Sequence, residues 1–357
     1  MAELVVAFEN LTDRERQVLA NLIDYYIATA GPVGSRAIAH KYRMGLSSAT
    51  IRNTLQDLED LGLVEQPHTS AGRIPTDSGY RVYVDSILRP EPLSDDEKTI
   101  IRRRLVRDGR GIREILGQTA KILSDITHQL GLTVAPRFEV GILKDIRLIP
   151  VADDRLMVVV VMHSGLARSL ILEVETSLAD ESIAEVELVL NERLRGLTLS
   201  DIRDTISARL ADVSGHGRVI KIVIDSKDQI WSEDRSEDLI FSGTDNLAAM
   251  PEFADRERLK AMLKVVEEGR VLSDFLSQAQ GEGLVITIGR EHAIDEIINC
   301  SLVTATYKVG EISGAVGIIG PTRLPYSKAV SIVEYAARSI SDLLAGMDRQ
   351  KDQQRNG

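Results

Sequence analysis

Hydrophobic residues recur at helical spacing near the start of the chain, behind polar residues of the kind that cap helices. Thr12 and Glu15 have the spacing of a capping box, in which each side chain bonds the other residue's backbone N–H group. The apolar positions that follow share one helix face: Val18, Leu19, Leu22, Ile23, Tyr26 and Ile27. Gly31 and Pro32 then predict the end of this helix, because neither residue sustains helical backbone.

Two more helices are predicted directly afterwards. Ser35 is expected to cap a short helix over residues 36–42, and a tight turn follows it. Ser47 or Ser48 caps a third helix, which Gly62 ends at the position past a helix where glycine is favoured. The third helix carries one apolar stripe, which we expect to be buried: Ile51, Leu55, Leu58 and Leu61.

A hairpin and a further helix complete this region. LVEQ (residues 63–66) and RIPT (residues 73–76) predict two short strands with PHTSAG at the tip between them. A helix is expected over residues 77–88. Two helices joined by a tight turn and followed by a hairpin are the elements of a winged helix-turn-helix.

A linker is predicted at residues 89–98, where two prolines and a charge run surround a second capping box, Ser94 and Glu97. Two helical patterns follow, and the second is amphipathic over residues 112–130. A three-strand meander is predicted over residues 138–174. Its middle strand, LMVVVVM, is apolar on both faces, so we expect both faces to be covered.

The last half of the chain mixes helices and strands. Residues 176–280 have mostly helical periodicity, interrupted by the strand-like RVIKIVID (residues 218–225). LVITIGR, SLVTATYKV and SGAVGIIG predict three strands, and a last helix is expected over residues 327–344. The tail from residue 346 is expected to be disordered. These elements predict an α+β protein of several domains.

Composition excludes several classes of protein. The 357 residues suffice for two or three domains, and a single cysteine, Cys300, allows neither an intrachain disulfide nor a cysteine metal cluster. The N-terminus lacks the basic and apolar regions of a secretion signal. The longest apolar run, residues 156–162, is far too short to span a bilayer, so we expect a cytoplasmic protein without a membrane partner.

Charge is distributed unevenly for a chain with a formal net charge of −11. Residues 31–56 contain no Asp or Glu, yet they carry Arg36, Lys41, Arg43 and Arg52. Residues 1–90 as a whole are slightly acidic, with nine Lys and Arg against eleven Asp and Glu. The basic character is therefore local, as expected of a surface that faces a polyanion.

The third predicted helix has the polarity of a DNA-reading helix. Its N-terminal half presents short hydroxyls that suit phosphates and Arg, Asn and Gln side chains that suit base edges. Its acids appear only from Asp57 onward. Arg73, in the predicted wing, could enter the minor groove or pair with phosphate. The predicted DNA-binding residues are Ser35, Arg36, Arg43, Ser47, Ser48, Thr50, Arg52, Asn53, Gln56, His68, Thr69, Ser70 and Arg73. The alternative is an ordinary packed helix in a protein-binding domain.

The residues themselves are more specific than their pattern. The stretch GPVGSRAIAHKYRMGLSSATIRNTLQDLEDLGLVEQPHTSAGRIPTDSGYRVYVD closely resembles the N-terminal domain of the heat-inducible transcription repressor family HrcA. LNERLRGLTLSDIR, ITIGRE and GIIGPTRLPYSKAVSIVEY resemble that family's C-terminal signatures. This chain has His292 where the family carries Asn, and Leu324-Pro325-Tyr326 where it carries Met-x-Tyr. Both departures lie outside the DNA reader.

The resemblance implies a bacterial homodimer that represses class I heat-shock (chaperone) operons. It implies binding to the inverted-repeat operator CIRCE, relief by heat, association with the nucleoid when bound, and maintenance of the active repressor by the GroE chaperonin. It also implies a domain layout: a winged-helix domain at 1–88, a linker and connecting helix at 89–110, a GAF-like domain at 111–175 and 271–345, an inserted dimerising domain at 176–270, and a tail at 346–357.

An enzyme is a poorer interpretation. The six histidines have no metal-ligand spacing, and Ser164 and Ser214 lack the nucleophile-elbow motif. Cys300 has the surroundings of a buried structural thiol. We therefore predict no catalytic residue, metal or cofactor. A third class stays open, because a GAF-like domain could enclose a small-molecule pocket. A midpoint of thermal unfolding that rises with ligand concentration would identify such a sensor.

Overall fold

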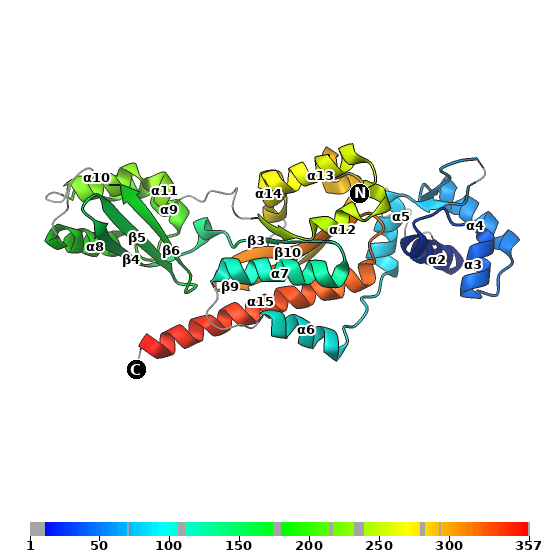
Figure 1. Ribbon diagram of the computed structural model, residues 1–357, viewed down its shortest axis with the longest axis horizontal. Helices are drawn as coiled ribbons and strands as arrows, with labels where there is room; N and C mark the ends of the chain where they lie inside the picture. Colours follow the sequence, from blue (N-terminus) through cyan, green and yellow to red (C-terminus); the bar gives the residue numbers. More distant parts are fainter. Residues whose placement is uncertain are drawn as a thin grey trace. The chain divides into compact units, whose positions relative to one another are not determined.

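The computed structural model describes residues 11–69, 71–105, 111–173, 180–213, 217–231, 239–278, 283–292 and 294–355, and it confirms the predicted α+β class. It consists of two compact units (Figure 1). The first combines the chain up to Thr133 with Leu239–Thr306 and Val316–Ser339; the second combines Val134–Asp238, Tyr307–Ala315 and the chain from Ile340. Each unit is described separately below.

The first unit begins with the predicted winged helix-turn-helix. Its elements are α2 (Asp13–Thr29), α3 (Ser35–Tyr42), α4 (Ser48–Asp60), β1 (Val64–Glu65), β2 (Ile74–Pro75), α5 (Asp77–Val82) and the π-helical turn η1 (Tyr83–Ile87). The capping box before α2 is present, because Glu15 N–H donates to the Thr12 hydroxyl and Thr12 N–H donates to the Glu15 carboxylate. Ser35 is the first residue of α3 and not its cap; Gly34 holds the cap position without a side-chain bond.

Buried side chains from the three helices and the hairpin meet in one core: Leu19, Leu22, Ile23, Ile38, Ile51, Leu55, Leu58, Leu63 and Val64. The predicted stripe of α4 is buried with one exception. Leu61, the C-cap residue of α4, is 46% exposed. Gly62 follows with a positive φ of 71°, as predicted for a helix end.

Most of a five-stranded sheet of order β7–β3–β10–β9–β8 also belongs to the first unit. Its strands are β3 (Leu130–Val134), β7 (Leu239–Ser242), β8 (Leu284–Ile288), β9 (Cys300–Val309) and β10 (Ile312–Pro321). The helices of this part of the chain are α6 (Asp95–Leu105), α7 (Ile112–Thr127), α12 (Thr244–Ala248), α13 (Arg256–Glu268), α14 (Arg270–Gln278) and α15 (Tyr326–Arg355), with short 3₁₀ turns η4 (Pro251–Phe253), η5 (Gly289–His292) and η6 (Asp295–Ile297). Figure 1 shows α7 and the first part of α15 along one side of the sheet, and α13 and α14 along the other.

Two predictions about these elements were wrong. Leu130 was expected to end a helix over residues 112–130, but α7 stops at Thr127 and Leu130 opens strand β3. His128 takes the left-handed conformation that ends the helix, with φ of 54°. The tail expected to be disordered is helical to Arg355, because residues 348–355 contain neither glycine nor proline and are mostly good helix formers.

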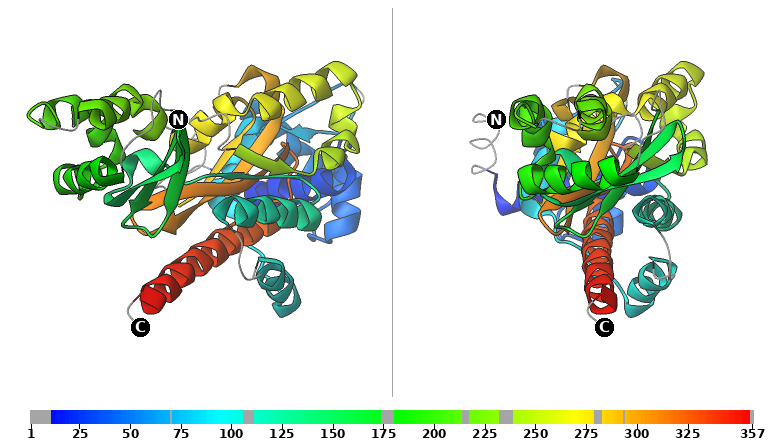
Figure 2. Two further views of the ribbon diagram at one scale, coloured as in Figure 1. Left: turned by 60° about the vertical axis from the view of Figure 1, so that its left-hand side comes forward. Right: turned by 90° about the vertical axis from the view of Figure 1, so that its left-hand side faces the viewer.

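The second unit is a three-stranded antiparallel meander with helices on one face. β4 (Leu143–Ala152), β5 (Arg155–Met162) and β6 (Ala167–Glu173) pair in sequence order, after a 3₁₀ turn η2 (Phe138–Val140). Helices α8 (Asp180–Leu194), α9 (Leu199–Arg209), α10 (Gly217–Asp225) and α11 (Lys227–Trp231) lie beside the sheet in both views of Figure 2. Side chains of β4–β6 and all four helices share one buried core.

This unit corrects two further predictions. RVIKIVID is helix α10, because Val219, Ile220 and Val223 share one helix face and pack into that core. The middle strand β5 is covered on one face only, since its side chains alternate between buried and half-buried. The inner face of the meander packs on the helices that follow it, and the domain bounds implied by the family resemblance stay a prediction.

Candidate nucleic-acid interface

Helix α4 is positioned by a buried face and a capped N-terminus. Ser47 is the cap: its Oγ accepts a hydrogen bond from Thr50 N–H at 3.1 Å and lies 2.9 Å from the Thr50 hydroxyl. Thr54 is buried with the apolar stripe, and its hydroxyl donates to the Thr50 carbonyl at 3.2 Å. The remaining face, with Ser48, Arg52 and the residues beside them, is consequently turned to solvent.

Side chains from three elements surround one hollow of about 710 Å³ on the winged helix. It is lined by the start of α3, the exposed face of α4 and the hairpin. Seven of the thirteen predicted DNA-binding residues line it: Ser35, Arg36, Arg52, Asn53, Gln56, Thr69 and Arg73. Arg43, Ser47, Ser48, Thr50 and His68 lie outside it, and Ser70 falls outside the described residues.

The charges on this surface are exposed cations. Arg36, Arg43 and Arg52 are exposed, and the described residues contain no ion-pair partner for any of the three. Arg43 follows α3 in the left-handed conformation, with φ of 43°, and so lies in the turn before α4. Cations without acidic partners are available to an incoming polyanion.

Arg73 lies at the base of the wing and is already paired. Its guanidinium forms an ion pair with Glu59 at 2.7 Å and donates to Gln56 Oε1 at 3.3 Å. Its backbone exchanges two 2.9 Å hydrogen bonds with Val33. A Cβ at the neighbouring Gly72 would overlap the Val33 backbone, so only glycine allows this approach. Arg73 therefore ties the wing to α4, a role that its sequence context did not reveal.

The tip of the wing is held by a residue that the sequence analysis missed. Gln66 donates through Nε2 to the carbonyl oxygens of Thr69, at 3.1 Å, and Ala71, at 3.0 Å. Ala71 N–H also donates to the His68 carbonyl at 2.8 Å. His68 and Thr69 are exposed on this turn. The sequence signal for this role was Gln66 itself, an amide side chain placed just before a tip of small residues.

Comparison with known proteins decides the family. A family model described as "Winged helix-turn-helix transcription repressor, HrcA DNA-binding" matches residues 10–86, and one described as "HrcA protein C terminal domain" matches residues 113–330. The chain belongs to the HrcA family. The resemblance seen in the sequence is confirmed by these two matches, which cover the DNA reader and most of the remaining chain.

Relatives of nearly equal length carry the name "Heat-inducible transcription repressor HrcA". The HrcA protein of Pelotomaculum thermopropionicum is 37% identical over 337 residues, which cover 94% of this chain and 97% of the relative. The HrcA protein of Chlorobium phaeobacteroides is 36% identical over 350 residues, with 95% and 99% covered. A crystal structure of a hypothetical protein at 2.2 Å resolution has a TM-score of 0.60 and 24% identity, covers 94% of this chain and 99% of that one, and supports the fold.

Enzyme and metal chemistry find no support in the described residues. They contain no group of three or more His, Cys, Asp or Glu side chains able to hold a metal ion. Cys300 is buried, and burial raises the pKa of its thiol to about 12, so no thiolate nucleophile forms near neutral pH. HrcA relatives are named as transcription repressors and not as enzymes. Within the described part of the chain, every helix is too short or too polar for a membrane span.

Proposed function

We propose that this HrcA-family chain is a cytoplasmic, homodimeric repressor that binds the CIRCE inverted repeat of class I heat-shock (chaperone) operons. The observation that carries the proposal is the acid-free N-terminal half of α4, exposed on a helix whose opposite side is buried. Arg52 and Asn53 can donate paired hydrogen bonds to base edges in the major groove. The N-terminus of α4 adds attraction for a phosphate.

The other predicted residues divide by their surroundings. We propose that Arg36 and Arg43 contact phosphates, because both are exposed and unpaired among the described residues. Hydroxyl side chains and one imidazole from α3, α4 and the wing would contact the sugar-phosphate backbone of DNA: Ser35, Ser47, Ser48, Thr50, His68, Thr69 and Ser70. Gln56 also donates to Asp60 at 3.1 Å, so Gln56 and Arg73 support α4 unless DNA binding releases them.

Arg52→Ala and Asn53→Ala should each weaken binding to the operator by roughly 1–3 kcal/mol, because each loses a base contact. Fluorescence anisotropy with operator and scrambled duplexes at one fixed salt concentration measures this loss. Arg14→Ala is the matched control, since Arg14 is an exposed arginine on α2 that does not line the hollow. Operator affinities that match this control in both variants, with intact circular dichroism, would remove α4 from the interface.

The second unit supports the proposed dimer. On the outer face of its sheet, Ile149 lies opposite Met157, and Met157 lies opposite Ile171. Ile149 is 43% exposed and Ile171 is 55% exposed. A row of apolar side chains across a sheet face in water is typical of an interaction surface. We therefore propose that residues 134–238 form the inserted dimerising domain, and that the five-stranded sheet with its helices forms the GAF-like domain.

Mild heating of the purified chain should reduce operator binding, and the GroE chaperonin with ATP should restore it. The physical reason is that partial opening of apolar segments such as β5 would expose a surface that a chaperonin binds and returns to the folded state. The fraction of chain that binds operator, titrated across a temperature series with and without chaperonin, measures this effect. An active fraction that chaperonin leaves unchanged at every temperature would contradict this mode of control.

A regulator that senses a small molecule through the GAF-like domain stays an alternative prediction.

A further inference from the structure

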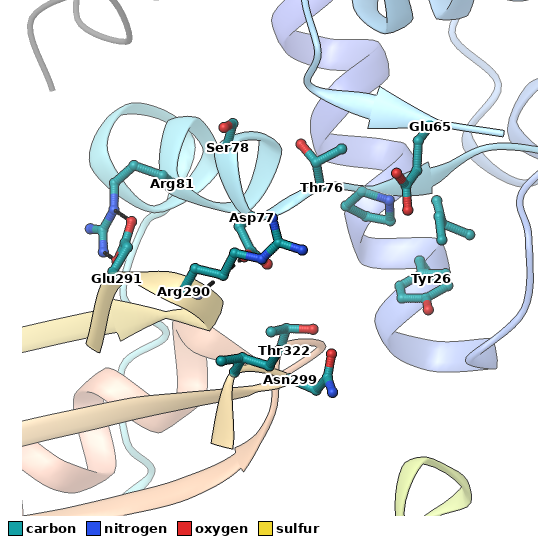
Figure 3. A pocket seen from close by; sticks show the side chains of 13 residues that line it. Tyr26, Glu65, Thr76, Asp77, Ser78, Arg81, Arg290, Glu291, Asn299 and Thr322 are labelled. Atoms are coloured by element: carbon teal, nitrogen blue, oxygen red, sulfur yellow. Dashed lines mark hydrogen bonds and ion pairs between the residues drawn. The ribbon is translucent and has the colours of Figure 1, made fainter. Parts of the chain in front are cut away.

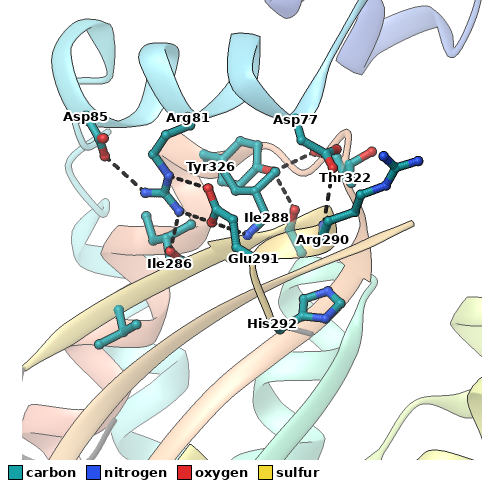
Figure 4. A network of polar contacts seen from close by, with 12 residues as sticks. Asp77, Arg81, Asp85, Ile286, Ile288, Arg290, Glu291, His292, Thr322 and Tyr326 are labelled. Atoms are coloured by element: carbon teal, nitrogen blue, oxygen red, sulfur yellow. Dashed lines mark hydrogen bonds and ion pairs between the residues drawn. The ribbon is translucent and has the colours of Figure 1, made fainter. Parts of the chain in front are cut away.

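The signature-like segment ITIGRE, residues 286–291, contacts the winged helix within the first unit (Figure 4). Arg81 of α5 donates from Nε to Glu291 Oε1 at 2.8 Å, and its Nη2 pairs with the second Glu291 oxygen. The same Nη2 donates to the Ile286 carbonyl at 2.7 Å, and Nη1 donates to Asp85 at 3.0 Å. Every nitrogen of the guanidinium is therefore engaged.

Glu291 is also held by a hydrogen bond within its own segment. Ile288 N–H donates to Glu291 Oε2 at 2.8 Å, so the turn η5 folds this carboxylate back on its own strand. Arg81 and Glu291 are also partly shielded, with 23% and 33% of their side chains exposed. A two-pronged contact between a planar guanidinium and a fixed carboxylate is directional as well as attractive.

A second contact lies one helical turn earlier on α5. Asp77 accepts a hydrogen bond from Arg290 N–H at 3.2 Å. Gly289 makes this approach possible, because its φ is 56° and a Cβ there would overlap the Asp77 carboxylate. Asp77 and Arg81 are four residues apart and so lie on the same helix face. Asp77 and Arg81 of α5 are thus hydrogen-bonded to two consecutive residues of η5, Arg290 and Glu291.

The rest of this boundary combines a buried aromatic contact with an open hollow. Tyr80 packs on Tyr326 with ring centroids 5.8 Å apart, and Arg323 donates to the Ile27 carbonyl at 3.4 Å. Beside these contacts lies a hollow of about 690 Å³, into which Arg290 and Asn299 face (Figure 3). Because the hollow occupies part of the boundary, the angle between the winged helix and the sheet is set by this aromatic pair together with the directional contacts of Asp77 and Arg81.

We propose that Arg81 and Glu291 are positioning residues that set the angle of the DNA reader, and with it the half-site spacing that the dimer accepts. The inference rests on the proposed dimeric binding to an inverted repeat. Two recognition helices reach successive major grooves only when their separation matches the helical repeat of DNA. A reader whose angle is fixed matches one spacing, whereas a reader that swivels tolerates several.

The test uses full-length Glu291→Gln, which keeps the size of the side chain and removes its charge. Glu296→Gln is the matched control, because Glu296 is exposed on η6 and makes no described contact with α5. Binding is measured to a single half-site and to inverted repeats whose spacer changes by single base pairs. Glu291→Gln should bind the half-site within about twofold of wild type, while its preference for the best spacing over the adjacent ones falls about fivefold or more, since linked binding depends steeply on geometry.

Arg81→Lys provides a second variant, which keeps the charge and loses the fork, and the same flattened spacing profile is expected. A spacing profile that stays sharp in both variants would overturn the proposal. Loss of half-site binding would overturn it too, because the pair would then support the fold of the reader and not its angle. Wild-type chain that binds random DNA as tightly as the half-site would instead overturn the proposed function.

Discussion

Ile171→Glu is expected to split the dimer and to weaken binding to the full inverted repeat by a factor on the order of 10²–10⁴. Ile171 lies 55% exposed in the apolar row on the outer face of the second unit. A carboxylate in this row would have to enter an apolar interface without a partner, and this costs several kcal/mol. The two readers would then bind separately, so the effective-concentration gain of a linked pair would be lost. Analytical ultracentrifugation and operator titration measure the two effects.

The control for this change is Val271→Glu, another apolar-to-acid substitution at a position that is 52% exposed, on α14. It should leave both the dimer and operator affinity intact. Affinity for a single half-site should also be unchanged in Ile171→Glu, because α4 is untouched. An Ile171→Glu chain that still sediments as a dimer would show that this face is not the interface. A fragment of residues 1–90 should bind the inverted repeat more weakly than the full chain does. Equal affinities would contradict the proposed dimer itself.

Leu55→Ala should lower the free energy of unfolding of the winged helix by about 2–5 kcal/mol. Leu55 is 4% exposed, and its removal leaves a cavity between α4 and the helices it packs on. Amide hydrogen exchange of α2, α3 and α4 as a function of urea reports this local stability. Operator binding at low temperature should survive, because Leu55 is buried and the proposed base contacts come from its exposed neighbours Arg52 and Asn53.

Leu61→Ala is the informative comparison on the same sequence stripe. Because Leu61 is 46% exposed, the change should cost no more than about 0.5 kcal/mol. Equal losses at Leu55 and Leu61 would mean that the stripe is buried to its end, as periodicity alone predicts.

Residues close together in the sequence determined most of the winged helix. The capping box of Thr12 and Glu15 and the cap at Ser47 depend on residues three positions apart, so the chain specifies them wherever it folds. The acid-free surface around Arg52 is equally local, because residues in neighbouring helical turns share a face. These features predicted the elements, the fold class and the candidate DNA-reading face.

Tertiary contacts decided what periodicity left ambiguous. RVIKIVID suits a strand or a helix, and it became α10 because Val219, Ile220 and Val223 pack into a core built by the meander and its helices. The meander covers one face only, so its apolar outer row became a surface. No local rule predicts which face a partner element will cover, since that depends on segments far along the chain.

The polar contacts around the reader show the same division. Arg73 was predicted from its place in the wing to contact DNA, which stays a prediction; its contacts with Glu59 and Gln56 were not predicted, because only folding of the hairpin brings it beside α4. Arg81 and Glu291 are separated by 210 residues. Each is an ordinary surface charge in the sequence, and only the packing of α5 against η5 joins them. Short-range spacing therefore determined the helices and their faces, whereas pairing between distant side chains was decided by the tertiary structure.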